Sequence, residues 1–289
     1  MVSSRTVAVV LLMTPLAPSV LAQRSESTAS LLLRFDNEHD LSAKEHLLLT
    51  VTNKDAGAGP SLLRLAESTT NSDTRWMAMR GMATLRYTAC APFLEASLKD
   101  FDALVRANAA RALGDLRIGS ASGALLAMFA TEKEPPAIQQ ASLALRMLNI
   151  KAAAPYIREK ISAFTGQTRA WLIQALGTLG SAAADVPLVA AYLDERMSDM
   201  AATEAIQELA GVSFGPRTLG PIGYPPPETV AARAWWKSHK DLWPHCDDCH
   251  PSGFRPERLT SDGSHRSAAT RLCETPTRLV PRPSQAAGS

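Results

Sequence analysis

Apolar residues recur through the middle of the chain at an interval of about 31 residues, in stretches that predict amphipathic helices. Five stretches align on a large apolar residue, with separations of 31, 32, 31 and 30. These residues are Leu85, Leu116, Leu148, Leu179 and Leu209. Each stretch has another large apolar residue three positions earlier, on the same helix face, and a small residue just before it. The small residues, which let a neighbouring helix approach closely, are Gly81, Ala112, Ala144, Ala175 and Ala205.

A second apolar-periodic stretch follows each of the first four helices after a short break. These second helices are expected at 92–99, 121–131, 152–163 and 185–196. One pair of helices cannot bury its apolar stripe alone, whereas stacked pairs share a continuous core. The pattern therefore predicts an all-α solenoid, and we expect the second helices of the pairs to line its concave face.

The segment Asp102-x-x-Val-Arg-x-x-Ala-Ala-x-Ala-Leu-Gly-x-Leu closely resembles the HEAT-repeat pattern, in the short form named for phycobilisome-lyase-like proteins. The resemblance covers roughly residues 72–210 and implies a right-handed α-solenoid of about five HEAT-like helix pairs. This architecture hosts scaffolds, adaptors and a few enzymes, so its presence does not define a function. The chain contains no phosphate-binding loop, paired-histidine zinc helix or Gly-x-Ser-x-Gly turn. We therefore expect a scaffold that binds a protein partner on its concave surface, and not an enzyme.

Composition shifts divide the chain into six expected parts. They are a signal peptide (1–22), a linker (23–39), a degenerate N-terminal repeat or cap (40–70), the solenoid (71–210), a Gly/Pro loop with a capping helix (211–243), and a flexible tail (244–289).

The first 22 residues have the order of a secretory signal. Arg5 precedes the apolar run Val7–Met13, which is too short to span a membrane, and small residues end at Ala22. We expect cleavage there, a periplasmic or secreted product, and no membrane span in the remainder. Lys and Arg number 30 against 28 Asp and Glu, so a strongly basic nucleic-acid-binding protein is excluded.

Three arginines occupy the same position in their repeats, namely Arg75, Arg106 and Arg169. They predict either a basic stripe for an anionic partner or a ladder of ion pairs between repeats, with Asp73 or Asp102 as the acids. The second interpretation is favoured, because charges on repeat helices are usually solvated or paired.

A Phe-Gly loop and a helix at 228–240 containing Trp235-Trp236 follow the last repeat. This order resembles the closing segment of many bacterial HEAT-repeat proteins. Two large indoles would cover the open edge of the array. The other interpretation is an aromatic platform for a ligand.

The tail carries the main cluster of metal-binding residue types, in the segment Trp243-Pro-His-Cys-Asp-Asp-Cys-His250. Its Cys246-x-x-Cys249-His250 motif resembles the attachment site of c-type cytochromes. There, two thiols bond the haem vinyl groups and the histidine binds the iron. The resemblance implies an alternative function, an electron-transfer subunit with one covalent haem and a redox partner.

The cytochrome resemblance is incomplete, since only 39 residues follow His250 and none is methionine. His265 could then supply the sixth iron ligand, as could His239 or His245. Two other interpretations stay open. One is a structural zinc ion held by Cys246, Cys249, His265 and Cys273, and the other is a Cys246–Cys249 disulfide or a tail without a bound group. Cys90, in the repeats, is interpreted as a small buried apolar residue.

Overall fold

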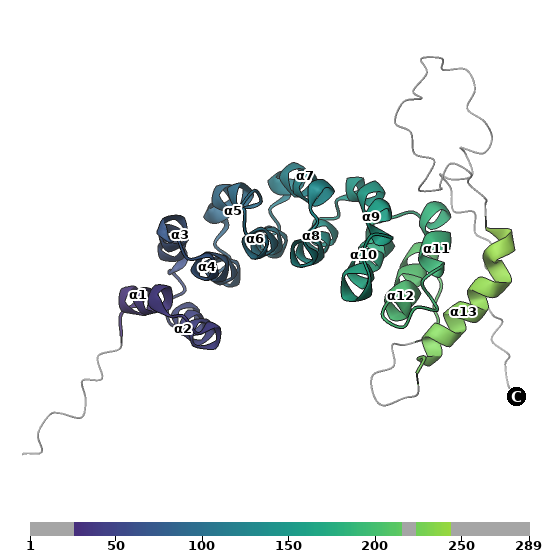
Figure 1. Ribbon diagram of the computed structural model, residues 1–289, viewed down its shortest axis with the longest axis horizontal. Coiled ribbons are helices and arrows are strands. Elements are labelled where there is room, and N and C mark those ends of the chain that lie inside the picture. The colour runs from purple at the N-terminus through teal and green to yellow at the C-terminus, as the bar shows by residue number, and fades with distance from the viewer. Residues whose placement is uncertain (1–25, 216–223, 244–289) are drawn as a thin grey trace, which may run out of the picture.

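The computed structural model describes residues 26–215 and 224–243 (Figure 1). These residues form thirteen α-helices and no strand, which confirms the predicted all-α solenoid. The helices are α1 (Thr28–Asn37), α2 (Leu41–Lys54), α3 (Gly59–Ser68), α4 (Ser72–Thr84), α5 (Ala91–Ser97), α6 (Ala103–Asp115), α7 (Ser122–Thr131), α8 (Pro135–Met147), α9 (Ala154–Ile161), α10 (Gly166–Leu179), α11 (Ala182–Ala190), α12 (Asp199–Ala210) and α13 (Pro227–His239).

The helices pair as hairpins, but each helix has a different partner from the one expected. Each odd-numbered helix from α1 to α11 packs against the even-numbered helix that follows it, which makes six pairs among the described residues. The pairs predicted from the sequence join α4 to α5 and α6 to α7, because an apolar stripe does not show which neighbour covers it. The observed pairing also places α1 in the first pair, with α2. The segment 23–39 is therefore not simply a linker, since Leu31, Leu32 and Phe35 of α1 are buried.

The pairs stack into an arch with two layers of helices (Figure 1). The even-numbered helices α2 to α12 form the inner, concave layer, and the odd-numbered helices α1 to α11 form the outer layer. The expectation that the second helices of the predicted pairs would line the concave face is therefore wrong. Those segments are α5, α7, α9 and α11, and they lie in the outer layer.

Small residues explain why the inner helices lie close together. A Cβ atom on Gly114 of α6 would lie 2.9 Å from the Cα atom of Ala144 on α8. The equivalent distance from Gly177 of α10 to Ala205 of α12 is 2.8 Å. Neither contact leaves room for a side chain. Close approach in one layer bends the stack towards that layer, so these residues shape the arch.

A second feature joins the ends of the inner helices. Arg86, Arg117 and Asn149 follow α4, α6 and α8 in the left-handed conformation, at φ angles of 55°, 58° and 53°. The side chain of Arg86 donates to the carbonyl oxygen of Asp115 at 2.7 Å, and that of Arg117 donates to the carbonyl oxygen of Met147. Each cation thus binds the C-terminal end of the next inner helix, where the helix dipole is negative.

Helix α13 packs against α12 and closes the array, which confirms the predicted capping helix. Trp235 and Trp236 are half-buried and lie against the apolar core together with Trp243. The indole nitrogen Nε1 of Trp243 donates to the carbonyl oxygen of Ala183 at 3.2 Å. The aromatic side chains therefore cover the last repeat, as an end cap requires.

Candidate functional site

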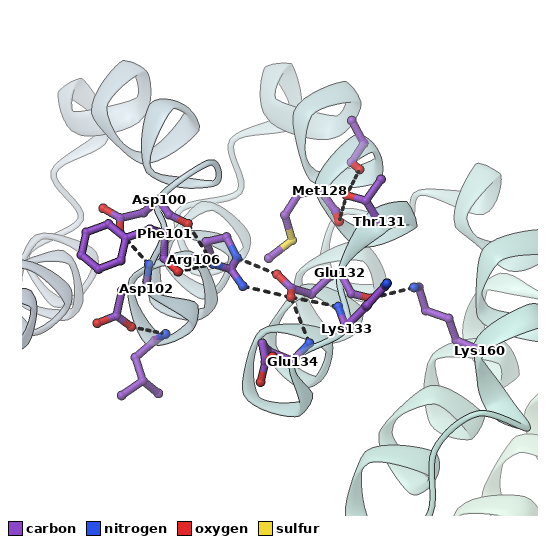
Figure 2. Close-up of polar contacts among 12 residues, drawn as sticks. Asp100, Phe101, Asp102, Arg106, Met128, Thr131, Glu132, Lys133, Glu134 and Lys160 are labelled. Atoms are coloured by element: carbon purple, nitrogen blue, oxygen red, sulfur yellow. Dashed lines mark hydrogen bonds and ion pairs between the residues drawn. The ribbon is translucent and has the colours of Figure 1, made fainter.

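The three equivalent arginines lie where the inner helices begin, and Figure 2 shows the central one. Arg106 of α6 makes two hydrogen bonds to the carboxylate of Glu132, of 2.7 Å from Nε and 3.0 Å from Nη2. Its Nη1 donates to the carbonyl oxygens of Asp100 and Phe101, which precede α6. Lys160 of α9 donates to the carbonyl oxygen of Glu132 at 2.9 Å. One arginine and one glutamate thus join consecutive helix pairs.

The same contact occurs in two other repeats. Arg75 pairs with Asp100 at 2.9 Å, and Arg169 pairs with Glu195. The three acids stand in the connections before α6, α8 and α12, so each arginine reaches the next repeat. The predicted ladder of ion pairs is confirmed, although the acids are not Asp73 and Asp102. These arginines stabilise the array, and their charges are compensated.

Glu132 is well suited to this structural role. Burial alone would raise the pKa of its carboxyl group, but hydrogen bonds outweigh burial and the pKa lies below its ordinary value. The donors are Arg106 and the backbone N–H groups of Glu134 and Lys133. The carboxylate stays ionised at neutral pH, because its charge is fully hydrogen-bonded.

At the end of the ladder the charges are reversed. Asp199 occupies the position of the arginines in α12 and is almost completely buried. Its Oδ2 accepts a hydrogen bond of 2.5 Å from the hydroxyl of Tyr224, and Arg233 of α13 lies 3.9 Å away. Burial and the bond to Asp199 raise the pKa of Tyr224 to about 12. This cluster holds the capping segment in place.

The candidate binding surface is a groove on the concave layer. It has a volume of about 650 Å³ and crosses α4, α6 and α8. The charged residues that line it are Arg80, Arg86, Arg111, Arg117 and Asp115. Arg86 and Arg117 donate to backbone carbonyls in the described structure, so these bonds leave their positive charges uncompensated. The groove therefore has an excess of positive charge.

A second groove of about 590 Å³ lies between α5 and α7, and Arg106 and Glu132 form part of its wall. Because these two side chains bind each other across the repeat, the groove presents a compensated ion pair. The other charged residues that line it, Glu95 and Lys99, have opposite signs, so this groove has no net charge and is the weaker candidate.

The aromatic side chains at the C-terminal end pack mainly on each other. Trp235 contacts Phe214, Trp236 and Trp243 at ring-centroid distances of 5.8, 6.5 and 5.9 Å, and it stacks on His239 at 4.7 Å. These mutual contacts favour the cap over the ligand platform.

The predicted cofactor and metal ligands Cys246, Cys249, His250 and His265, with Cys273, lie outside the described residues. Within residues 26–215 and 224–243, no three His, Cys, Asp or Glu side chains gather as a metal site would require. In the same ranges, no helix has both the length and the apolar character needed to cross a membrane.

Cys90 is a buried free thiol, as expected. Its Sγ donates to the carbonyl oxygen of Tyr87, and burial raises the pKa of the thiol to about 11. At that pKa the nucleophilic thiolate is scarce at neutral pH, so Cys90 has a structural role.

Sequence reasoning did not single out the four groove arginines. A signal was present, because Arg80 and Arg111 hold one repeat position and Arg86 and Arg117 another, each time 31 residues apart. Once the inner layer is known, these positions can be assigned to the concave face.

The family model described as HEAT repeats matches residues 59–146, which begin at α3 and reach the end of α8. The match supports HEAT repeats over α3 to α8, and the stacked pairs show that the described residues form an all-α solenoid. No curated protein matches the chain.

Proposed function

We propose that this HEAT-repeat protein is an exported scaffold that binds a protein partner on its concave face. The observation that carries the proposal is the open groove across α4, α6 and α8, with four arginines and a single lining carboxylate. HEAT repeats suggest an interaction scaffold in general. Within the groove Arg80 pairs with Glu45 and Arg111 with Asp115, so Arg86 and Arg117 supply its excess positive charge.

The division of work between the arginines supports this proposal. Ion pairs between repeats compensate the charges of Arg75, Arg106 and Arg169. Arg86 and Arg117 also contribute to stability, but their acceptors are neutral carbonyls. A neutral acceptor leaves the net charge available to a partner.

Photo-crosslinking of the exported protein tests the proposed face. A photo-reactive amino acid replaces Gln140, which lines the concave groove, or Tyr156, which is exposed on the outer helix α9. We expect a crosslinked partner from position 140 and little or none from position 156. Equal crosslinking from both positions, or crosslinking from 156 alone, contradicts docking on the concave face.

Export is tested on the same preparation. The signal-like segment that ends at Ala22 supports cleavage, so N-terminal sequencing of the exported product should begin at Gln23. A cytoplasmic product that retains Met1 would contradict export.

A second candidate function rests on the Cys246-x-x-Cys249-His250 motif, which begins three residues after Trp243. Covalent haem there would make the protein an electron-transfer subunit. Haem staining of denatured protein from a host that matures cytochromes c tests this function, with Cys246→Ala/Cys249→Ala as the control. Staining lost in that variant supports haem, and colourless wild-type protein rejects it.

A further inference from the structure

The concave groove has a basic end, formed by Arg86 and Arg117, where two inner helices finish. Arg86 donates to the carbonyl oxygen of Asp115 at 2.7 Å, and Arg117 donates to that of Met147. Asp115 ends α6 and Met147 ends α8, so the two guanidinium groups lie at the C-terminal ends of neighbouring helices. Among the described residues, neither of these two arginines forms an ion pair with a carboxylate.

The other two arginines of the groove are compensated. Arg80 pairs with Glu45 at 3.0 Å, and Arg111 pairs with Asp115 at 2.8 Å. The positive charge that a ligand can use is therefore that of the basic end. The C-terminal end of a helix carries only about half an elementary negative charge, so each guanidinium group of the basic end stays net positive.

The opposite end of the groove is apolar. Leu104, in the first turn of α6, lines the groove and is 44% exposed. Phe101 stands just before α6 and is 87% exposed. Arg106 donates to the carbonyl oxygen of Phe101, and the phenyl ring points away from the ion pair of Arg106 with Glu132 (Figure 2). Because its backbone is held, the exposed ring offers a preformed contact to an apolar side chain.

The groove is neutral between its two ends. Ala107 and Ala112 of α6 line it and are buried, and such small side chains let a main chain approach closely. Asn108 and Gln140 also line it, and amide side chains can hydrogen-bond to a main chain. The middle of the groove therefore suits an extended polypeptide.

From these positions we infer that the groove binds an extended protein segment with a pair of acidic residues at one end and an apolar residue at the other. The acidic pair lies over the basic end, and the apolar residue lies over Leu104 and Phe101. This inference rests on the proposed function and adds the chemistry and direction of the bound segment.

The length of the segment follows from α6. This helix has 13 residues, so its two ends lie about 20 Å apart. An extended chain covers that distance with about six residues. The guanidinium groups of the basic end stand on neighbouring helices, whose axes lie about 8–10 Å apart. Two consecutive acidic side chains point to opposite sides of an extended chain, so each can reach one of these groups.

A nucleic acid fits this groove less well than such a segment. Its phosphate groups recur along the whole strand and need positive charge along the whole groove. Here the available positive charge is confined to one end, and the other end is apolar. A segment with charge at one end only matches both.

The test uses the full mature protein and the fluorescein-labelled peptide Glu-Glu-Ser-Gln-Ser-Gln-Leu, with binding measured by fluorescence anisotropy. Arg86→Gln/Arg117→Gln should weaken binding by about tenfold, because two charge contacts are lost. Arg86→Lys/Arg117→Lys keeps both charges and should weaken it less than about threefold. The control Arg64→Gln/Lys99→Gln removes the same charge from exposed positions outside the concave groove, and it should change binding less than about twofold.

A second comparison tests the apolar end. Phe101→Ser/Leu104→Ser should weaken binding of the Leu-ended peptide by about fivefold, and it should leave binding of the same peptide ending in Ser unchanged. Equal weakening of both peptides would contradict the apolar contact. Circular dichroism melting of each variant separates lost binding from lost folding.

Three further results would overturn the inference: a peptide that binds no better than its Gln-Gln counterpart, folded glutamine variants that bind as well as the lysine variants, or a fluorescent oligothymidine that binds more tightly than the peptide. A natural partner that crosslinks from position 140 and not from 156 would leave the proposed function standing in each case. Crosslinking from 156 alone would reject the proposed function whatever the peptide does. The two ideas therefore fail separately.

Discussion

The ion pair between Arg106 and Glu132 gives the sharpest prediction about stability. Oε1 of Glu132 accepts from Arg106 Nη2 and from the backbone N–H groups of Lys133 and Glu134, while Oε2 accepts only from Arg106 Nε. A Glu132→Gln side chain can keep its Oε1 contacts but replaces Oε2 with an NH₂ group that cannot accept. One charge-assisted hydrogen bond is lost, and such a bond contributes about 2 kcal/mol.

We therefore expect Glu132→Gln to lower the free energy of unfolding by about 2 kcal/mol at neutral pH. Solvent screening reduces this energy only slightly, because the side chains of Arg106 and Glu132 are just 16% and 5% exposed. Urea denaturation followed by far-ultraviolet circular dichroism measures the change. Because the pair joins neighbouring repeats, the transition should also become less cooperative.

The pair of Arg111 and Asp115 supplies a matched control on the same helix. Their side chains are 43% and 30% exposed, and they lie one turn apart. Asp115→Asn should cost no more than about 0.5 kcal/mol, as is usual for exposed pairs within a helix.

The pH dependence provides an independent check. The pKa of Glu132 is lower in the folded protein than its ordinary value of 4.5, so the unfolded chain binds more protons near that pH. The contribution of Glu132 is fully present above pH 4.5 and is lost as the pH falls through the lowered folded-state pKa. The gap between the wild type and Glu132→Gln should shrink in acid. A gap no larger than that of Asp115→Asn, or one that persists in acid, would refute the reasoning.

Further predictions concern backbone strain, packing and buried groups. Asn149→Gly should raise stability by about 0.5 kcal/mol because it relieves the left-handed conformation, and an unchanged melting temperature would argue against strain there. Gly114→Val should lower stability by about 3 kcal/mol by forcing α6 from α8, whereas Gly123→Ala, with nothing within 4 Å, should be neutral or stabilising in the same denaturation assay. Lys44→Met should increase amide hydrogen exchange in α1, because the buried ammonium group donates to three carbonyl oxygens at or just beyond its C-terminal end; unchanged exchange would contradict this role. In a variant whose sole cysteine is Cys90, the thiol should react with a disulfide reagent only on unfolding, and rapid reaction of the folded protein would contradict its burial.

The sequence alone determined the class of fold, because an apolar period is a local property of the chain. The interval of about 31 residues, the small residues beside each apolar pair and the Trp235-Trp236 cap can all be recognised in the order of the residues. The arginine ladder is also predictable as a type of contact, since three arginines recur at one repeat position.

Tertiary structure decided which helices pair and which layer is concave. An amphipathic stripe records that a helix is covered but not by which neighbour, so the predicted partner of α4 is wrong and α1 falls in the predicted linker. The acids of the ladder are misassigned for a related reason: each arginine reaches the connection before the next inner helix, a contact of 25 to 26 residues that no local pattern indicates. The charged groove likewise exists only because curvature brings the equivalent faces of α4, α6 and α8 together, and curvature follows from close packing between residues far apart in the chain.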